Sequence, residues 1–509
     1  MLTAKQGKVY IVGAGPGDPG LITIKGIRCI EEAEVIIFDH LVSEELLRYA
    51  KTDVRLIYAG KQGGDHTLSQ DEINHRLVEE ASRGRIVTRL KGGDPFIFGR
   101  GGEEALMLSA AGIPFDIVPG VTSAIAVPAY AGISLTQRGY TSTLAFVTGH
   151  EDPTKERSAI NWQALAGIGT LVFLMGVKNL SQIAESLIEN GKPAETPAAL
   201  IRWGTTTQQK TLTATLGTIA GQAEAAGFSP PSILVVGDVV AIREQLNWFE
   251  TKPLFGKGIV ITRPEAQAES LSDLLLDMGA RAIHFPTIRI VAPESWTDCD
   301  NALAQLQTYQ WMIFTSANGV RFFFERLQAS GHDIRDLKDI RFCTIGPATA
   351  EAIKKMGLRV DLIPREYISE GIVQAFENVN LQGAKVLLPR AEQARDVIPE
   401  GLTRLGAQVD VVTVYRTINS GREKKELEPL LNSGEVDVIT FTSPSTVANF
   451  MEIMGKDFVL PQTVKIAVIG PVTAAAAEKA GMPIHILQET YTIPGLVAAM
   501  KEFFKKENT

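Results

Sequence analysis

Short apolar runs of strand length alternate with longer amphipathic segments along the whole chain. Near the start, KVYIVG (8–13) is followed by an amphipathic stretch at 21–33 and then by EVIIFD (34–39). The same order recurs where RIVTRL (85–90) precedes GGEEALMLSAAG (101–112). Strands that alternate with helices are typical of α/β domains with mainly parallel sheets. The pattern therefore predicts an α/β fold.

The second half of the chain repeats itself after a break at NWFETKPLFGKG (247–258). The segment 258–290, which begins GIVITRPEAQ, is similar to the segment 384–417, which begins AKVLLPRAEQ. RFCTIGPATAEAIKKMG is likewise similar to KIAVIGPVTAAAAEKAG. Several matches at nearly one offset indicate two copies of one α/β unit. We therefore predict two similar lobes with a cleft between them.

The composition is that of a globular chain, with 45% apolar and 21% charged positions among 509 residues. No apolar run reaches the roughly 18–20 residues that cross a bilayer, and no secretory leader precedes the first strand. We therefore expect a cytoplasmic protein that does not contact a membrane. The net charge of −8 disfavours nucleic acid as a partner. Three cysteines and seven histidines without metal-ligand spacing predict no metal site.

The first predicted strand runs into a glycine-rich turn, VGAGPGD, at residues 12–18. A dinucleotide fingerprint would need its third glycine at position 18, which is Asp18. Pro16 also removes a backbone N–H that a phosphate cradle would use. The spacing therefore disfavours a nicotinamide cofactor, and a tight turn without any ligand is the plain alternative.

The longest motif is RLKGGDPFIFGRGGEE, at residues 89–104, in which five glycines surround Asp94 and Arg100. Glycines let a ligand approach the backbone without interference from a Cβ. PGVTSA (119–124) has the same character and adds two hydroxyl groups in a turn. Packing alone explains such a density of glycines poorly, so both motifs are candidates for a ligand site.

These motifs follow one another as in the tetrapyrrole methylases: GAGPGD, a strand that ends at Asp39, GK at 60–61, GGDPFIFGRGGEE, PGVTSA and LMG. The segment 7–250 resembles this family and is most similar to uroporphyrinogen-III C-methyltransferase. The resemblance implies two α/β domains, 7–117 and 118–250, with S-adenosyl-L-methionine bound between them. It also implies a homodimer that forms through this half of the chain.

The resemblance further implies which residues line the cofactor site. They are Pro16, Gly92, Gly93, Asp94, Ile97, Thr122, Ser123, Met175 and Gly204. Taken alone, Met175 would be interpreted as an ordinary core methionine, because it ends the apolar run TLVFLM.

Asp39 and Lys61 are the base and acid that the resemblance implies. Methylation of a pyrrole carbon yields a cationic ring that must lose a proton, and a carboxylate can accept this proton or stabilise the cation. Alternatively, Asp39 caps a helix and Lys61 anchors a substrate carboxylate. Arg100 is a candidate for bidentate binding of the substrate's carboxylates.

Paired hydroxyl residues follow a predicted strand in each repeat of the second half. Thr315-Ser316 and Thr442-Ser443 each precede a predicted helix, whose first backbone N–H groups can bind a carboxylate. Plain helix capping is the alternative at every one of these sites. All four residues are therefore candidates for binding an anionic substrate.

Through VLLPRAEQAR, VVTVYRT and FTSPST, the repeats resemble uroporphyrinogen-III synthase over about residues 256–505. The resemblance implies a bilobal α/β fold with two similar lobes, lobe one from 256–287 and 418–509 and lobe two from 288–417. The repeat alone would have favoured two contiguous lobes. Tyr415 matches the family's tyrosine and could donate a hydrogen bond to a leaving hydroxyl group. Packing between strands is its alternative role.

Together the resemblances imply a bifunctional enzyme with small tetrapyrrole substrates. It would cyclise hydroxymethylbilane to uroporphyrinogen III with inversion of ring D. It would then methylate C2 and C7 to give precorrin-2, a precursor of sirohaem and cobalamin. An alternative is a methyltransferase whose second half is a non-catalytic tetrapyrrole-binding module. A nicotinamide oxidoreductase is a third possibility, and the glycine spacing opposes it.

Overall fold

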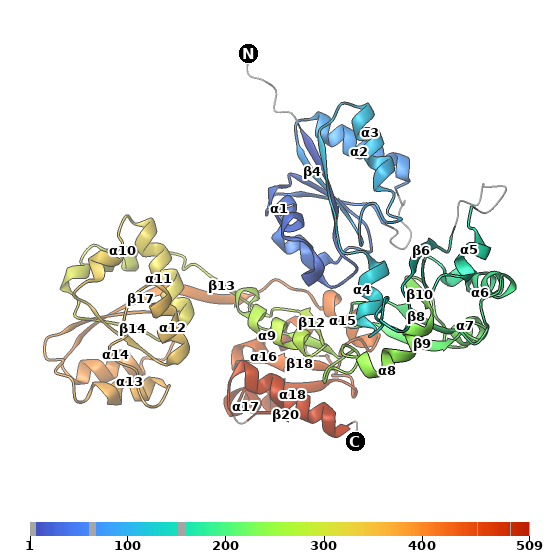
Figure 1. Cartoon of the computed structure of the whole chain (residues 1–509). Helices are drawn as coiled ribbons and strands as arrows, with labels where there is room; N and C mark the ends of the chain where they lie inside the picture. Colours follow the sequence, from blue (N-terminus) through green and yellow to red (C-terminus); the bar gives the residue numbers. More distant parts are fainter. Residues whose placement is uncertain (1–6, 61–67, 151–158, 456, 489, 508–509) are drawn as a thin grey trace, which may run out of the picture. The chain divides into compact units, whose positions relative to one another are not determined.

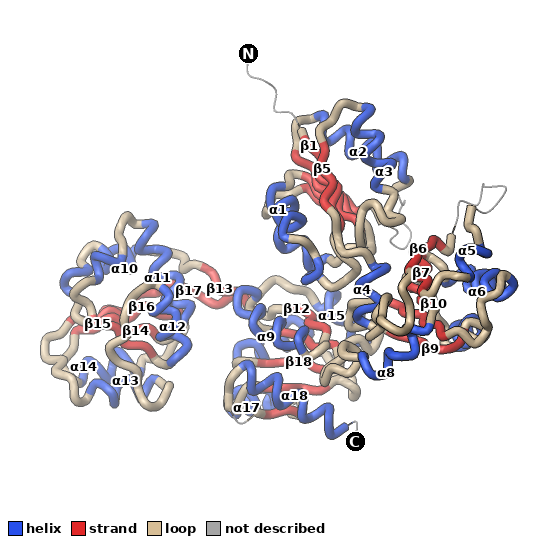
Figure 2. The backbone as a smooth tube through the Cα atoms, viewed as in Figure 1, coloured by secondary structure: helices blue, strands red, loops and turns tan. Residues whose placement is uncertain are grey.

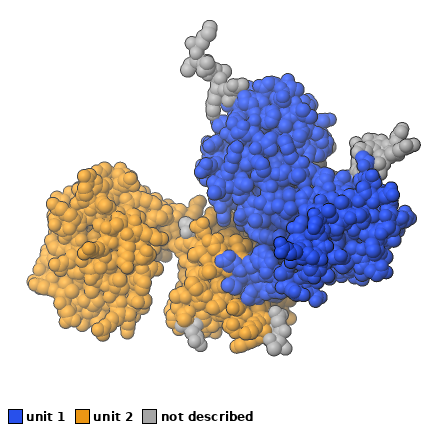
Figure 3. All heavy atoms as spheres, viewed as in Figure 1, with its two compact units in different colours: residues 1–257, 277–281 blue, residues 258–276, 282–509 orange. Residues whose placement is uncertain are grey.

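A computed structural model describes residues 7–60, 68–150, 159–455, 457–488 and 490–507 (Figure 1). The chain divides into two compact units, unit 1 with residues 1–257 and 277–281 and unit 2 with residues 258–276 and 282–509 (Figure 3). Within the described ranges, no helix is long and apolar enough to cross a membrane. The same ranges hold no group of three metal-ligating side chains placed to bind an ion.

Unit 1 begins with a parallel sheet in the order β3-β2-β4-β1-β5. Its strands are β1 (Lys8–Gly13), β2 (Val35–Phe38), β3 (Arg55–Tyr58), β4 (Ile86–Lys91) and β5 (Phe115–Val118). The helices of this part are α1 (Ile24–Glu32), α2 (Gln70–Ser82) and α3 (Gly101–Ala110). Because all five strands run the same way, their carboxyl ends meet at one edge, where ligands of open α/β sheets bind.

The second sheet of unit 1 has the order β6-β7-β10-β8-β9. Its strands are β6 (Leu144–Thr148), β7 (Thr170–Leu174), β8 (Pro197–Arg202), β9 (Lys210–Thr215) and β10 (Ser232–Val236). Its helices are α4 (Ser123–Tyr130), α5 (Trp162–Ala166), α6 (Leu180–Glu189), α7 (Ile219–Ala225) and α8 (Arg243–Leu246). Only β6 and β7 pair in parallel, so the expectation of a mainly parallel sheet is wrong here. The connection between β8 and β9 is too short for a crossover helix, so the two strands must be antiparallel.

Unit 2 contains two further five-stranded sheets (Figure 2). The first, in the order β12-β11-β18-β19-β20, is formed by β11 (Gly258–Ile261), β12 (Arg281–His284), β18 (Val438–Phe441), β19 (Lys465–Val468) and β20 (Ile486–Leu487). The helices near these strands in the sequence are α9 (Glu265–Asp277), α15 (Lys424–Asn432), α16 (Pro444–Met454), α17 (Pro471–Lys479) and α18 (Ile493–Glu507). This sheet joins two ends of the second half, because Ile259 pairs with Val438.

The other sheet of unit 2 has the order β13-β17-β16-β14-β15. Its strands are β13 (Ile288–Val291), β14 (Trp311–Phe314), β15 (Arg341–Thr344), β16 (Lys385–Ala391) and β17 (Gln408–Asn419). Its helices are α10 (Thr297–Leu303), α11 (Ala317–Ala329), α12 (Pro347–Lys355), α13 (Ser369–Phe376) and α14 (Val397–Arg404). The expected α/β architecture with two similar lobes is confirmed. Short 3-10 helices lie at Pro19–Leu21, Glu44–Tyr49, Val177–Asn179, Asp238–Ile242, Leu306–Thr308 and Ile334–Leu337.

Strand β17 is long and changes partner along its length. Its first part pairs in parallel with β16, and its last part pairs antiparallel with β13. The register with β16 shifts between Arg390 and Ala391, so Ala391 pairs with Tyr415 rather than with the residue before it. Such a bulge re-aims side chains, and Tyr415 lies at this one.

The segment that follows α8 packs on unit 1 through aromatic rings. Phe249 is only 6% exposed. Its ring centroid lies 4.8 Å from that of Tyr130 on α4, 5.5 Å from that of Trp248 and 5.3 Å from that of Phe255. These residues therefore complete the core of unit 1 and do not form a free linker.

We expect Phe249→Ala to destabilise unit 1 by about 3–5 kcal/mol, because it leaves a cavity among aromatic rings. Hydrogen exchange, measured separately for each peptide fragment, should show that amides of unit 1 lose protection and that amides of unit 2 keep theirs. Phe458→Ala is the matched control, since Phe458 packs on Phe450 within unit 2. Equal losses of protection in both units of the Phe249 variant would contradict this assignment.

Candidate functional site

The loops that follow β1 and β4 are joined by backbone hydrogen bonds. Ala14 N–H donates to the Lys91 carbonyl at 2.8 Å. Gly15 and Gly93 exchange two further bonds, at 3.2 and 2.7 Å. The predicted GAGPGD and GGDP motifs, which are almost eighty positions apart in the sequence, therefore form one structure at the carboxyl edge of the first sheet.

A third loop, which follows β5, brings its backbone directly against the backbones of the other two. A Cβ added to Gly120 would lie 2.4 Å from the Gly93 carbonyl oxygen and 2.7 Å from Gly13 Cα. A Cβ added to Gly13 would lie 2.6 Å from that same carbonyl oxygen. No side chain fits between these backbones, so the sequence can hold only glycine at Gly13 and Gly120.

Gly93 is constrained by its conformation more than by space. Its φ is +69°, and an added Cβ would lie 3.5 Å from Ser123 N, which is an ordinary contact. A larger side chain would extend over the start of α4, where Thr122 accepts a hydrogen bond from Ala124 N–H at 3.3 Å. The structure thus brings together Gly93, Thr122 and Ser123, three of the residues that the resemblance assigns to the cofactor site.

The Asp94 carboxylate organises the backbone around it. One oxygen accepts hydrogen bonds from Phe96 N–H at 2.8 Å and from Ile97 N–H at 3.1 Å. The other oxygen accepts from Gly120 N–H at 3.1 Å. Asp94 therefore ties the loop after β4 to the loop after β5, and both of its oxygens already have partners. The Ile97 side chain itself is exposed.

The GAGPGD turn also contacts α4 and the loop between β8 and β9. Asp18 N–H donates to Thr205 Oγ at 3.1 Å, and the Tyr130 hydroxyl donates to the Asp18 carboxylate at 2.6 Å. Burial and the hydrogen bond to Asp18 raise the pKa of Tyr130. Gly204 lies against α4, where an added Cβ would be 2.3 Å from a methyl carbon of Val127. The half-buried Pro16 belongs to this turn.

The residues other than glycine that adopt a left-handed backbone conformation occur mainly in the loops of unit 1. Among the described residues, five of the six such positions are in this unit: Phe98, Arg100, Met175, Trp203 and Thr205. Strained conformations of this kind cluster at ligand sites. Met175 directly follows β7 and its side chain is half-exposed, so the core interpretation is wrong for it. Within the described ranges, no hydrogen bond joins Met175 to the loops of the first sheet.

Asp39 follows β2 at the same edge of the first sheet. One carboxylate oxygen accepts from Leu41 N–H at 3.2 Å, and the other lies 3.3 Å from a terminal nitrogen of Arg89. The Asp39 side chain remains 28% exposed. It is thus held from two sides but still accessible. Lys61, its expected partner, lies outside the described residues.

Arg100 already has a partner in this structure. Its guanidinium donates two hydrogen bonds to Glu103, from Nε at 2.8 Å and from Nη2 at 2.7 Å. This pair raises the pKa of Arg100 and lowers that of Glu103. Both side chains are more than half exposed. A substrate carboxylate would therefore have to share the guanidinium with Glu103.

In unit 2, the structure brings Tyr415 and Ser316 together although 99 positions separate them. Their hydroxyl oxygens are 3.0 Å apart. Ser316 also caps α11 by accepting from Gly319 N–H at 3.0 Å. The Tyr415 ring stacks on Phe322 with centroids 6.0 Å apart, and burial raises the pKa of Tyr415. Tyr415 is therefore partly a packing residue, but its hydroxyl is held at the start of a helix.

The second hydroxyl pair lies at an equivalent place in the other sheet. Ser443 caps α16 by accepting from Thr446 N–H at 3.3 Å. Thr315 and Thr442 are both half-buried at the ends of β14 and β18. Helix capping therefore accounts for the positions of Ser316 and Ser443, as the alternative interpretation predicted. Capping is compatible with ligand binding at either site.

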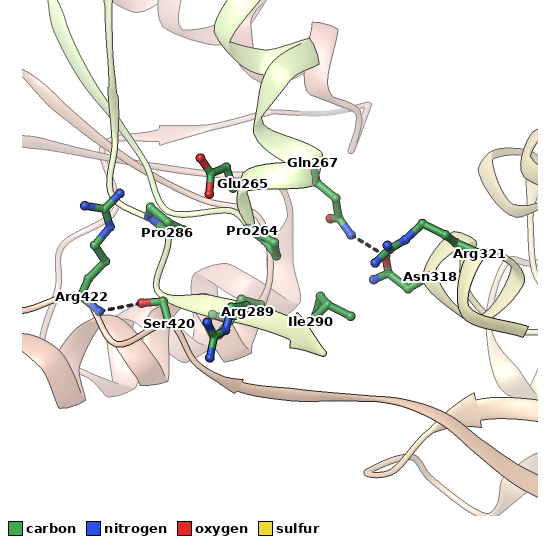
Figure 4. A pocket seen from close by; sticks show the side chains of 11 residues that line it. Pro264, Glu265, Gln267, Pro286, Arg289, Ile290, Asn318, Arg321, Ser420 and Arg422 are labelled. Atoms are coloured by element: carbon green, nitrogen blue, oxygen red, sulfur yellow. Dashed lines mark hydrogen bonds between the residues drawn. The ribbon is translucent and has the colours of Figure 1, made fainter. Parts of the chain in front are cut away.

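A cavity of about 590 Å³ in unit 2 is lined by residues that sequence reasoning missed (Figure 4). Its basic side chains are those of Arg289 on β13, Arg321 on α11 and Arg422 after β17. Glu265 is the acidic residue in its lining. Across this cavity, the side-chain amide of Gln267 donates at 3.1 Å to Oδ1 of Asn318, which lies in the first turn of α11. The excess of arginine makes this cavity suited to an anionic ligand.

Comparisons with known proteins agree with this division of the chain. Residues 8–220 match the family model "Tetrapyrrole (Corrin/Porphyrin) Methylases", and residues 269–498 match "Uroporphyrinogen-III synthase HemD". A "Porphyrin biosynthesis protein HemD" from Ruminiclostridium josui is 37% identical over 98% of both chains.

Two further relatives match the first half. A uroporphyrinogen-III C-methyltransferase of Bacillus subtilis is 53% identical over 48% of this chain and 96% of its own. A crystal structure of uroporphyrin-III-C-methyltransferase from Thermus thermophilus is 41% identical, with a TM-score of 0.40, and covers 47% of this chain and 96% of its own. The chain therefore belongs to the family of porphyrin biosynthesis proteins in which a tetrapyrrole methylase is joined to a uroporphyrinogen-III synthase.

Proposed function

We propose that the chain catalyses two successive steps of tetrapyrrole biosynthesis. Unit 2 cyclises hydroxymethylbilane to uroporphyrinogen III with inversion of ring D. Unit 1 then methylates this product at C2 and C7 to give precorrin-2, from which sirohaem and cobalamin derive. Similarity to a porphyrin biosynthesis protein over the whole chain supports the combination of both steps.

The methyltransferase proposal is carried by the contact of three glycine loops beside the partly exposed carboxylate of Asp39. Gly13, Gly93 and Gly120 bring the backbones of these loops into direct contact at the carboxyl edge of the sheet. This fits S-adenosyl-L-methionine, whose bound form supplies an electrophilic methyl group. Pro16, Gly92, Gly93, Asp94, Ile97, Thr122, Ser123, Met175 and Gly204 would hold it. Asp94 would do so by fixing the backbone, since both of its oxygens are engaged.

Asp39 takes the proton that the methylated ring must lose, or stabilises the ring's positive charge. Its carboxylate is oriented by Leu41 N–H and Arg89 and is still accessible, which suits a base. Lys61 donates a proton or anchors a substrate carboxylate. Arg100 binds a further substrate carboxylate in competition with Glu103.

The synthase proposal is carried by the arginine-lined cavity of unit 2. Arg289, Arg321 and Arg422, which line this cavity, bind carboxylates of the linear tetrapyrrole. The helix starts at Thr315, Ser316, Thr442 and Ser443, which are not among the residues that line it, bind further carboxylates. Tyr415 donates a hydrogen bond to the leaving hydroxyl group. Catalysis rests mainly on holding the chain in a conformation that can cyclise.

We also propose the domain bounds 7–117, 118–250, 256–287 with 418–509, and 288–417, which the four sheets support. A cytoplasmic homodimer forms through the methyltransferase half. The match to the tetrapyrrole methylases supports this homodimer.

The whole proposal is tested by incubation with hydroxymethylbilane, with and without S-adenosyl-L-methionine. Uroporphyrinogen III should accumulate without the methyl donor, and precorrin-2 should form with it. The isolated products should contain inverted ring D. Methylation of supplied uroporphyrinogen III without any cyclisation of hydroxymethylbilane would instead identify unit 2 as a non-catalytic binding module.

We expect Gly93→Val to abolish binding of S-adenosyl-L-methionine, as measured by calorimetry, and to leave cyclisation intact. A β-branched side chain at a φ of +69° is strained, and it would cover the start of α4. Gly112→Val is the matched control, because Gly112 has a φ of +67° and open space around it. Normal cofactor affinity in a folded Gly93 variant would refute this placement of the cofactor.

Asp39→Asn should slow methylation by about 10²–10⁴-fold, the usual contribution of a general base. Affinity for S-adenosyl-L-methionine should change little, because the amide keeps the shape of the carboxylate. Single-turnover kinetics isolates the methyl-transfer and deprotonation steps from product release. A wild-type rate under these conditions would exclude Asp39 as the base.

Tyr415→Phe should slow cyclisation by up to about 10²–10³-fold, as expected for one hydrogen bond to a developing charge. Inversion of ring D should survive, because conformation and not Tyr415 directs it. Tyr309→Phe is the control, since its hydroxyl donates to Asp410 at 2.6 Å in the same sheet and takes no part in the site. If the enzymatic product, corrected for spontaneous closure, becomes the uninverted isomer, the conformational account is wrong.

A further inference from the structure

Three charged side chains are buried directly behind Asp39. Arg89 and Lys91 on β4 are 3% and 4% exposed, and Glu104 on α3 is fully buried. Burying an ion costs several kcal/mol even after relaxation, so a cluster of this kind does not stabilise a fold cheaply. Because this cluster lies next to the candidate base Asp39, we expect it to have a functional role.

Glu104 uses one of its oxygens for all of its recorded hydrogen bonds. This oxygen accepts from Lys91 Nζ at 2.6 Å, from Arg89 Nε at 3.2 Å and from Gln70 Nε2 at 3.2 Å. The other oxygen has no partner among the described residues. Burial and the charge of Arg89 lower the pKa of Lys91, against the attraction of Glu104. The cluster is therefore crowded with positive charge.

Arg89 connects this cluster to Asp39. Its Nη1 donates to the Leu90 carbonyl at 2.8 Å. Its Nη2 donates at 3.3 Å to the Asp39 carboxylate oxygen that Leu41 does not contact. Two buried cations face one buried carboxylate, so the formal charges of the cluster balance only when Asp39 is included. Leu41 N–H holds the second Asp39 oxygen, so both oxygens are fixed.

We propose that Arg89 is a positioning residue for Asp39, that Glu104 holds Arg89 in place, and that Lys91 in turn fixes Glu104. The plane of the Asp39 carboxylate is set by Arg89 on one oxygen and by backbone on the other. Glu104 fixes the guanidinium through Nε, and Lys91 donates to the same Glu104 oxygen. This inference rests on the proposed function, because it assigns Asp39 the role of base.

The opposite end of β4 offers a contrast within the same sheet. Glu80 on α2 is also fully buried, but its two oxygens pair with Arg55 at 2.8 Å and Arg85 at 2.5 Å. The side chains of both arginines are more than a third exposed. A buried glutamate that only anchors a helix can thus draw its partners from the surface. The charged partners of Glu104 are instead buried, which a purely structural role does not require.

A double-mutant cycle tests the proposal. Methylation by the full chain is measured in single turnovers for Arg89→Gln, Asp39→Asn and the double variant, with cofactor affinity from calorimetry. Arg89→Gln should lower the rate by about 10²-fold, as a small misplacement of a catalytic group does. Affinity for S-adenosyl-L-methionine should stay within about twofold of the wild type, and Arg89→Lys should restore part of the rate.

The decisive quantity is the effect of Arg89→Gln in the Asp39→Asn background. If Arg89 acts through Asp39, the second substitution should change the rate by less than about twofold, because contacting residues are not additive. Independent losses that multiply would overturn the inference and leave the proposed role of Asp39 standing. A wild-type rate for Asp39→Asn would overturn the proposed role itself, and this inference with it.

Two further variants guard against a general loss of folding. Arg85→Gln, at the other end of β4, should lower thermal stability without changing the methylation rate. Glu104→Gln keeps the shape of the cluster and removes the charge that holds Arg89. It should slow methylation in the wild-type background and not in Asp39→Asn. If Glu104→Gln slows both backgrounds equally, the cluster is structural and the inference fails.

Discussion

Three backbone segments of unit 1 lie so close together that no side chain fits between them, and the candidate site depends on this contact. Gly120 and Gly13 both approach the Gly93 carbonyl oxygen closely enough to exclude a Cβ. Because the loops touch through backbone, one Asp94 carboxylate can bind N–H groups on two of them. These positions are therefore glycine because the close contact of the backbones requires it, and not because the chain must be flexible there.

The two units place their charged groups in opposite ways. In unit 1, Arg89 and Lys91 are buried and fixed, which is costly but gives Asp39 a defined orientation. In unit 2, Arg321 is exposed and pairs with Glu325 on its own helix, and the exposed Arg422 pairs with Glu426 in the first turn of α15. Exposed ion pairs are weak and can exchange partners. Such an arrangement suits a long, flexible substrate with many carboxylates.

Much of the candidate site could be read from motifs, but their contacts could not. GGDP predicted a ligand loop, while its tie to Gly120 through Asp94 required the neighbouring strand. Arg89 and Lys91 interrupt an apolar strand pattern, which is a signal for buried charge. Nothing local indicates that Glu104 would meet them. Exposed basic residues look alike in sequence, so the arginines of the unit 2 cavity gave no signal.

The sequence by itself determined the α/β class, the internal repeat and the positions of the motifs, because each follows from a short, local pattern. Only the tertiary structure decided that β10 lies antiparallel between β7 and β8. It also decided that Ile259 pairs with Val438 and that the Tyr415 hydroxyl meets Ser316. These outcomes depend on the register of strands that are far apart in the chain. Pairing of this kind is selected by the packing of whole layers, which no local pattern records.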